Sequence, residues 1–270
     1  MYIDTHTHSD FSYDADYPLE VMIKAAEDAG LSVLAVTDHC DIERLHIDHL
    51  YESMPKAAQT LLQFRGSTNL TLLCGIEVGE FCWNIPAVRR ILSASPYDMV
   101  IGSVHVLHGC DDFYVLDYST LDDNALFDLF SRYYNEALEL ARFGEFDTFA
   151  HLIYPYRYFN LYERGGMAFA EQFDKQANEL FHILAESGKA FEFNTASYSR
   201  GGAELALYLR YLSMFREAGG EYVTVGSDAH FPEHVGRYMK EAYFALKAAG
   251  FCTVTYFKER TPVQIPLCTD

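Results

Sequence analysis

Short apolar runs alternate along almost the whole chain with longer stretches in which apolar residues have a helical spacing. The short runs are rich in β-branched and aromatic residues and are bounded by glycine or polar residues, which is typical of strands buried in a parallel sheet. In the longer stretches, apolar positions recur every three to four residues, as on one face of a helix. We therefore predict seven strands, each followed by a helical segment, over residues 2–8, 32–39, 70–77, 98–106, 146–152, 189–194 and 222–227.

Two of the helical segments have clear boundaries. The first begins at Pro18 and stops at Gly30, and proline near the start with glycine just past the end is the usual asymmetry of helices. The second follows Ser119, and both Ser119 and Asp122 are candidates to cap its first turn. The positions expected to face the core are Leu19, Met22, Ile23 and Ala26 in the first helix and Phe127, Phe130, Tyr134, Leu138 and Ala141 in the second.

The alternation of strand and helix predicts an α/β fold built around a parallel sheet. No linker rich in glycine, serine or proline divides the chain, and no block of like charge or short-period repeat does so. The 270 residues are enough to bury a large core. We therefore expect residues 1–270 to form a single domain.

The composition is that of a globular protein, with 50% hydrophobic and 22% charged residues. The 39 Asp and Glu residues outnumber the 20 Lys and Arg residues, which gives a formal net charge of −19. Such a field repels nucleic acid and anionic membranes unless a basic stripe offsets it, and the basic residues here are scattered. We expect no nucleic-acid partner and no membrane partner, and the sequence leaves the oligomeric state open.

Six cysteines are dispersed along the chain without a Cys-x-x-Cys pair, at positions 40, 74, 82, 110, 252 and 268. In a chain that builds its own core, this pattern predicts free thiols in a reducing compartment. The first residues lack the basic and apolar regions of a signal peptide. We therefore expect a cytoplasmic location.

Histidine and carboxylate residues collect at the ends of the predicted strands. His6 and His8 lie two residues apart, so an extended strand places both on one face. Six of the seven predicted strands end in His, Asp or Glu, at the carboxyl end where parallel barrels place their sites. Asp14 lies in the loop after the first strand and can reach the same end. The full set of candidates is His6, His8, Asp14, His39, Glu77, His105, His151, Asp228 and His230.

Nine such groups in one place repel and desolvate one another unless cations bind them. A single histidine or aspartate at a strand end is more often a helix cap or a turn residue, but this explanation does not account for the whole set. Ligand sets of His and carboxylate without Cys suit Zn, Mn or Fe. Nine ligands are too many for one ion and sufficient for three, so we predict a multinuclear site that holds three divalent metal ions.

The candidates fall within six short segments, Asp4–His8, Thr37–His39, Gly75–Glu77, Gly102–His105, Ala150–His151 and Gly226–His230. In order, and over nearly the whole chain, these segments resemble the motifs of the PHP (polymerase and histidinol phosphatase) superfamily. Three further runs resemble its monofunctional histidinol-phosphate phosphatase branch. They are residues 37–40 (Thr-Asp-His-Cys), 153–157 (Ile-Tyr-Pro-Tyr-Arg) and 192–195 (Glu-Phe-Asn-Thr).

The resemblance implies a distorted (β/α)7 barrel, similar to a TIM barrel, with a trinuclear metal site at the carboxyl ends of the strands. One ligand of the third ion is His in some family members; here Asp14 is our candidate and Asp10 is a competitor. Asp4 and Asp38 are expected to hold ligand imidazoles from outside the site. The implied ligand sets are His6, His8, Glu77 and Asp228 for the first ion, Glu77, His105 and His151 for the second, and His39, His230 and Asp14 for the third.

Other residues near the predicted site suit a phosphate ester. Arg157 and Arg200 follow the fifth and sixth strands at the metal-bearing end, where a guanidinium could grip phosphoryl oxygens bidentately. A surface salt bridge is the alternative role for each arginine. Asp228 is our candidate for the catalytic group that protonates the leaving group, with a water at the metal site as the alternative. Glu80 is a candidate partner for a cationic group on the substrate.

The resemblance implies a metal-dependent phosphomonoesterase that hydrolyses L-histidinol phosphate to L-histidinol and phosphate in histidine biosynthesis. A second hypothesis keeps the chemistry but replaces the substrate with a small nucleotide or a phosphodiester, as in other superfamily members. A third is a non-catalytic, metal-stabilised binding module. Loss of a ligand would favour that third hypothesis, and none of the ligand positions is lost. We therefore expect a small phosphorylated substrate as the partner.

Overall fold

Seven parallel strands form one sheet, in which each strand pairs with its neighbours in sequence. The computed structural model describes residues 1–159, 166–200 and 202–267, with residues 199 and 200 described in their backbone alone. Pairing in sequence order is the simplest arrangement for a chain of strand–helix units, because each crossover returns the chain beside the previous strand. The strands are β1 (Tyr2–Asp4), β2 (Leu31–Val36), β3 (Thr71–Gly79), β4 (Met99–Ser103), β5 (Thr148–Phe149), β6 (Ala190–Asn194) and β7 (Val223–Gly226).

Backbone hydrogen bonds between the first and last strands nearly close the sheet into a barrel. The N–H of Thr5 donates to the carbonyl of Val225 at 3.0 Å, and the N–H of His8 donates to the carbonyl of Ala229 at 2.9 Å. The first bond joins the residue after β1 to β7, and the second joins extended chain beyond both strands, so β1 and β7 are shorter than the predicted runs. The expected α/β fold, a distorted (β/α)7 barrel, is confirmed.

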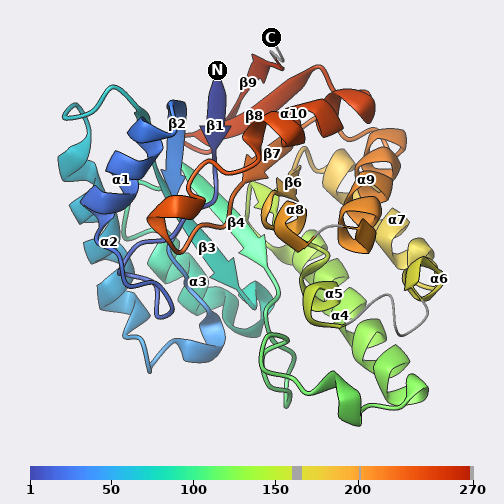
Figure 1. Ribbon diagram of the computed structural model, residues 1–270. Helices are drawn as coiled ribbons and strands as arrows, with labels where there is room; N and C mark the ends of the chain where they lie inside the picture. The colour runs from blue at the N-terminus through green and yellow to red at the C-terminus, as the bar shows by residue number, and fades with distance from the viewer. Residues whose placement is uncertain (160–165, 201, 268–270) are drawn as a thin grey trace.

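Helices cover the outside of the barrel. They are α1 (Leu19–Asp28), α2 (Leu50–Phe64), α3 (Ile85–Leu92), α4 (Asp123–Phe143), α5 (Tyr154–Tyr158), α6 (Gly166–Glu171), α7 (Asp174–Glu186), α8 (Ala196–Arg200), α9 (Gly202–Glu217) and α10 (Met239–Ala248). Figure 1 shows α1, α2 and α3 beside the first strands, and α7 and α9 beside the last ones. The short 3-10 helices are η1 (Ile42–Arg44), η2 (Phe81–Asn84), η3 (Tyr118–Thr120) and η4 (Pro232–His234).

The two helices with clear boundaries form where the sequence predicts them. All four apolar positions expected on the face of α1 are buried, and Gly30, just past its end, has a φ of 69°. Asp122 caps α4, since its carboxylate accepts a backbone N–H of the first turn at 2.8 Å, whereas Ser119 lies in η3. Phe127 is 45% exposed and was wrongly expected in the core. It lies at the edge of the buried face, where its ring stacks on Phe173.

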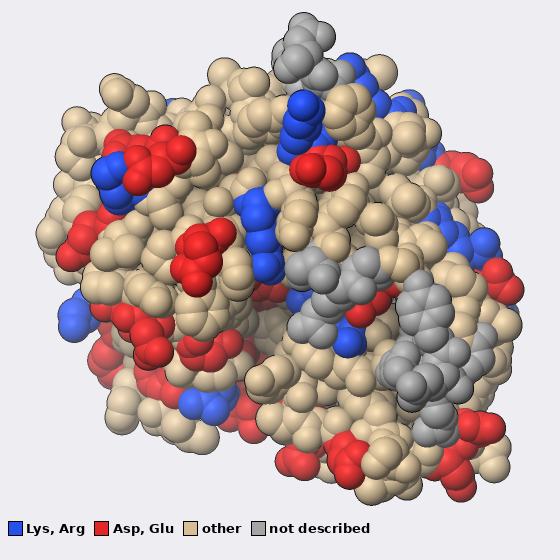
Figure 2. Space-filling model, in the orientation of Figure 1, with Lys and Arg blue, Asp and Glu red and all other residues tan. Residues whose placement is uncertain are grey.

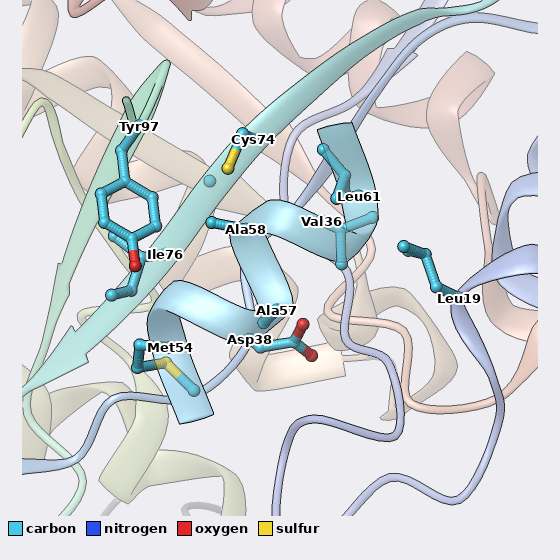
Figure 3. A pocket seen from close by; sticks show the side chains of 11 residues that line it. Leu19, Val36, Asp38, Met54, Ala57, Ala58, Leu61, Cys74, Ile76 and Tyr97 are labelled. Carbon is cyan, nitrogen blue, oxygen red and sulfur yellow. The ribbon is translucent and has the colours of Figure 1, made fainter. Parts of the chain in front are cut away.

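The apolar face of α2 packs on β2 and β3, as Figure 3 shows. Met54, Ala58 and Leu61 of the helix lie close to Cys74 and Ile76 of β3. The space left between them is about 10 Å³. A cavity of that size is at the lower limit for a single water molecule. This interface is therefore core, and it leaves no room for a ligand.

A C-terminal hairpin that the sequence analysis did not predict covers the end of the barrel where the amino ends of the strands lie. Its strands are β8 (Thr253–Lys258) and β9 (Thr261–Pro266), which pair antiparallel. At the turn, Glu259 and Arg260 have φ of 51° and 62°. The Arg260 guanidinium donates to Asp147 Oδ2 at 2.5 Å, and the N–H of Glu259 donates to Asp98 Oδ1 at 3.1 Å. Asp98 and Asp147 precede β4 and β5, so the turn is anchored at the amino ends of the strands.

Five of the six cysteines lie in the described part of the chain, and none of these forms a disulfide. Cys40, Cys74, Cys82, Cys110 and Cys252 are free, and Cys268 lies outside the described residues. Among the helices that the structure describes, none combines the length and the apolar character needed to cross a membrane.

Candidate metal centre

Glu77, at the carboxyl end of β3, lies at the centre of the predicted ligand cluster and is fully buried. Its Oε1 lies 2.9 Å from His151 Nε2 and 3.3 Å from His105 Nε2. Its Oε2 lies 3.0 Å from His39 Nδ1 and 3.2 Å from His6 Nε2. His8 Nε2 lies 3.6 Å from the same Oε2, so one carboxylate faces five imidazoles from four of the strand ends. This arrangement suits a carboxylate that bridges two cations.

Asp228 follows β7 and faces the other side of the first two histidines. Its Oδ1 lies 3.4 Å from His8 Nε2 and 3.7 Å from His6 Nε2. Its Oδ2 accepts from Arg157 at 3.1 Å and from the side-chain amide of Asn194 at 3.2 Å. Asp228 has a φ of 55°, a left-handed conformation that aspartate tolerates better than most residues. The two carboxylate oxygens therefore connect the histidine cluster to an arginine.

A third group of donors lies at the edge of the cluster. His39 Nε2 and His230 Nε2 are 3.4 Å apart, and the ring of His8 stacks on both imidazoles. Asp14 Oδ2 lies 3.2 Å from His230 Nε2 and 3.7 Å from His39 Nε2. Asp10, the competitor for this position, is exposed like Asp14, but of these two described residues only Asp14 has ion-pair contacts with His39 and His230. The geometry therefore favours Asp14, and the structure brings all nine predicted residues into one cluster.

The chemistry of this cluster fits divalent cations. Within the described residues, four groups of three side chains could each hold a metal ion. In each group, the three donor atoms lie within 4.8 Å of one another. Several buried atoms have no correctly oriented hydrogen-bond partner in the described chain, although opposite charges lie nearby; they include His6 Nε2, His8 Nε2, His39 Nδ1 and Glu77 Oε2. Buried polar atoms without partners are rare, and at a His and carboxylate site they are explained by an ion. The groups are His8, His39 and His230; His6, Glu77 and His151; His6, His8 and Asp228; and His39, Glu77 and His105.

Two glycines allow the chain to pass close behind these side chains. A Cβ on Gly226 would lie 2.3 Å from the Cβ of His6 and 2.6 Å from Glu192 Oε1. A Cβ on Gly79 would lie 2.3 Å from Asp41 Oδ1 and 3.1 Å from His105 Nδ1. Larger side chains at either position would displace an imidazole or the carboxylate behind it. Close packing of the backbone therefore fixes the positions of the donors.

Glu192 of β6 holds two of the candidate ligands at once. Its Oε1 lies 2.6 Å from His6 Nδ1, and its Oε2 accepts the backbone N–H of His151 at 3.0 Å. A carboxylate on the remote imidazole nitrogen fixes the ring orientation and leaves the other nitrogen free for an ion. Glu192 belongs to the run 192–195 that resembles the phosphatase branch, but no local pattern along the chain indicates this contact.

Other imidazoles are held by Ser12 and Asp41, rather than by the two aspartates that we expected. Ser12 Oγ lies 3.1 Å from His8 Nδ1, and Asp41 Oδ1 lies 3.1 Å from His105 Nδ1. The expectation for Asp4 and Asp38 was wrong in this detail. Asp4 accepts mainly from the backbone and hydroxyl of Ser227, and Asp38 from Ser9 and Ser12. Asp4 therefore fixes the segment after β7, and Asp38 fixes the loop after β1.

Glu80, the candidate partner for a cationic group on the substrate, lies beside the cluster and has a structural contact as well. It is buried, and its Oε1 accepts the backbone N–H groups of His105 and Val106 at 2.8 and 3.2 Å. Burial, together with the nearby charge of Asp41, raises the pKa of Glu80 to about 8. The carboxyl group therefore connects the ends of β3 and β4. Glu80 also lines the pocket over the cluster, so its role as a partner for a cationic group on the substrate stays a prediction.

The metal-free cluster has strongly perturbed proton affinities. Burial lowers the pKa of His8 to about 3, assisted by the positive charge of neighbouring histidines. Burial opposes protonation of His39 as well, but Glu77 and Asp41 dominate and raise its pKa to about 9. Burial opposes ionisation of Glu77, but His6, His39 and His105 hold its pKa well below the usual range. Protons thus occupy part of a site whose donor atoms suit metal ions, and the two compete.

A pocket of about 720 Å³ opens over the cluster and contacts Asp14, His39, His105, His151, Asp228 and His230. Figure 2 shows a hollow near the middle of this face of the molecule, with basic and acidic atoms at its rim. Arg157 of α5 lines the pocket, as predicted, and contacts Asp228. The side chain of Arg200 lies outside the described residues. Arg237, which the sequence analysis did not select, lines the same pocket.

Comparison with known proteins gives one family. A family model described as "PHP domain" matches residues 4–196. A curated relative from Clostridium acetobutylicum, named probable histidinol-phosphatase, is 26% identical over 266 residues, which cover 96% of this chain and 98% of the relative. Another with the same name, from Deinococcus radiodurans, is 29% identical over 263 residues and covers 94% of this chain and 95% of its own length.

One solved structure has the same fold over its full length. It is histidinol phosphate phosphatase from Lactococcus lactis subsp. lactis, complexed with zinc, L-histidinol and phosphate. The TM-score is 0.78 at 23% identity, and the match covers 97% of this chain and 98% of that chain. Since the family model spans most of the chain and agrees with the motifs read from the sequence, the chain belongs to the PHP domain family.

Proposed function

We propose that this protein is a metal-dependent phosphomonoesterase that hydrolyses L-histidinol phosphate to L-histidinol and phosphate. The observation that carries the proposal is the cluster of nine His and carboxylate side chains beneath an open pocket that also contains Arg157. Curated relatives that match nearly the whole chain are named probable histidinol-phosphatase. The Lactococcus structure with the same fold contains zinc, L-histidinol and phosphate.

The cluster supports binding of divalent ions, and we assign three of them. When bound, such ions acidify water and neutralise charge on phosphoryl oxygens, which is the chemistry that hydrolysis of a phosphate ester needs. Zn, Mn and Fe all suit the donor set. The proposed ligands are His6, His8, Glu77 and Asp228 for the first ion, Glu77, His105 and His151 for the second, and His39, His230 and Asp14 for the third.

Two residues beside the ions have distinct proposed tasks. Arg157 is buried and points a guanidinium nitrogen at Asp228, so it can orient both this carboxylate and a phosphoryl group in the pocket. Although burial opposes ionisation of Asp228, His6, His8 and Arg157 hold its pKa well below the usual range. The carboxylate is therefore ionised at neutral pH, and we propose that its Oδ2 takes the proton that the attacking water loses and returns it to the leaving alkoxide.

The experiment that tests this function is phosphate release from a substrate panel by protein of known metal content. The panel contains L-histidinol phosphate, p-nitrophenyl phosphate, a nucleoside monophosphate, a nucleoside bisphosphate and bis-p-nitrophenyl phosphate. We expect kcat/KM to be highest for L-histidinol phosphate by several orders of magnitude. A flat profile, or one that favours the nucleotides or the diester, would support the nucleotide or phosphodiester hypothesis instead. No release from any compound by metal-loaded protein would support the non-catalytic module.

A further inference from the structure

The backbone at Arg237 is fixed by hydrogen bonds to residues at the carboxyl ends of the barrel strands. The preceding residue, Gly236, has a φ of 72° and donates its N–H to Asp4 Oδ2 at 2.9 Å. Asp4 is the last residue of β1 and also accepts the N–H of Ser227, directly after β7, at 2.9 Å. The hydroxyl of Thr195, just after β6, donates to the carbonyl of Arg237 at 2.9 Å. Residues at the ends of β1, β6 and β7 therefore fix the position of the Arg237 backbone, and with it the origin of the side chain.

The side chain of Arg237 lines the pocket together with Arg157, Asp228 and His230. Its Nε is buried and has no hydrogen-bond partner among the described residues. Burial lowers the pKa of Arg237, and the positive charge of Arg157 lowers it further, while Asp228 offsets part of this effect. The guanidinium groups of Arg237 and Arg157 thus line one pocket, and Asp228, the carboxylate that Arg157 contacts, also faces His6 and His8.

An arrangement of this kind is costly unless an anion completes it. A half-buried guanidinium that lacks a partner loses hydration without a compensating hydrogen bond. Arginine in such a position is typical of sites that bind carboxylate or phosphate through several oxygens. The other arginine in the pocket lining, Arg44, differs in this respect because its Nε and terminal nitrogen donate to the two carboxylate oxygens of Asp48 at 2.6 and 3.0 Å.

We propose that Arg237 is a second phosphate-binding residue, which holds the phosphoryl group together with Arg157. This inference rests on the proposed function and adds a basis for its selectivity. A phosphomonoester has three terminal oxygens and up to two negative charges, whereas a diester has two such oxygens and one charge. Two guanidinium groups beside the metal centre therefore favour the monoester dianion.

The proposal is tested by binding of inorganic phosphate to metal-loaded protein, measured by calorimetry, together with the kinetics of p-nitrophenyl phosphate. We expect Arg237→Gln to weaken phosphate binding and to raise KM about tenfold or more, with unchanged metal content and melting temperature. Arg237→Lys should recover much of the phosphate affinity, because it restores the charge. Arg44→Gln is the matched control, and it should leave phosphate binding unchanged.

Two results would overturn the assignment of Arg237. One is an Arg237→Gln protein that keeps full metal and binds phosphate as tightly as the wild type. The other is a loss of phosphate binding that occurs together with loss of metal and is not recovered by Arg237→Lys, which would show a purely structural role. Because phosphate binding does not require turnover, failure of the substrate panel and failure of this inference can be told apart.

Discussion

Glu192 shows how much of the candidate site depends on a residue that does not line the pocket. It contacts His6 Nδ1 and the backbone N–H of His151 with its two carboxylate oxygens. We expect Glu192→Gln to lower metal affinity about 10- to 100-fold, because the amide is a weaker acceptor and orients the imidazole less firmly. Metal binding in competition with a chelator measures this change.

The control for that experiment is Glu186→Gln, at the exposed end of α7, which should leave metal affinity unchanged. Equal metal affinity of Glu192→Gln and wild-type protein would show that His6 keeps its orientation without the carboxylate. The proposed role of Glu192 would then be wrong.

The individual donors could be identified from the sequence, but most of the residues that hold them could not. His6, His39 and Glu77 stand at predicted strand ends, where the parallel topology alone brings side chains together. The contact between His6 and Glu192 spans 186 positions, and no local pattern marks it. Asp14 is an intermediate case, because its loop lies near the correct end and only the fold separates it from Asp10.

Among the elements, the strands could be predicted because their apolar runs are continuous. The residues at which the strands begin and end were harder to predict. The run 2–8 contains β1 and an extended segment that pairs with residues in and after β7 without forming a regular ladder. The hairpin of β8 and β9 was missed for a physical reason. The residues of β9 are exposed or half-buried, so the strand lacks the apolar run of the barrel strands.

The hairpin provides a prediction that separates stability from function. Arg260 at its turn donates to the nearly buried Asp147, and the contact lies at the amino ends of the barrel strands. We expect Arg260→Ala to cost about 1–3 kcal/mol, because it leaves a buried carboxylate without its charged partner. Such a loss corresponds to about 2–4 °C in melting temperature per kcal/mol for a chain of roughly this size.

The same Arg260→Ala protein should keep its metal content and kcat, since the metal centre lies at the other end of the strands. Lys258→Ala, at an exposed position of β8, is the control and should leave the melting temperature unchanged. If Arg260→Ala lost metal or activity at a temperature where it is folded, the two ends of the barrel would not be independent.

In the whole molecule, the local charge of the site matters more for the substrate than the net charge of −19. Salt screens distant surface charges beyond about 8–10 Å, whereas ions and arginines in the pocket act at contact distance.

The buried apolar residues form one cluster that extends from Ile3 to Leu267 and includes the hairpin. We therefore propose that residues 1–270 form a single domain.

The coupling of protons and metal gives a prediction for pH dependence. The pKa of His39 in the metal-free protein is raised to about 9, so below that pH an incoming ion must displace a proton. Metal affinity should therefore rise between pH 6.5 and 8, by up to about tenfold per pH unit for each proton displaced. Competition with a chelator at constant ionic strength measures this change. Equal affinity at both pH values would show that the ligands carry no protons before the metal binds.

The decisive experiment is to remove all metal by chelation, restore Zn, Mn or Fe(II) in steps, and follow both bound metal and phosphate release from L-histidinol phosphate. We expect no turnover by the chelated protein, a rise in rate as metal binds, and a plateau near three ions per chain. Chelated, folded protein that hydrolyses the ester as fast as metal-loaded protein would contradict the proposal that these nine side chains form a hydrolytic metal centre.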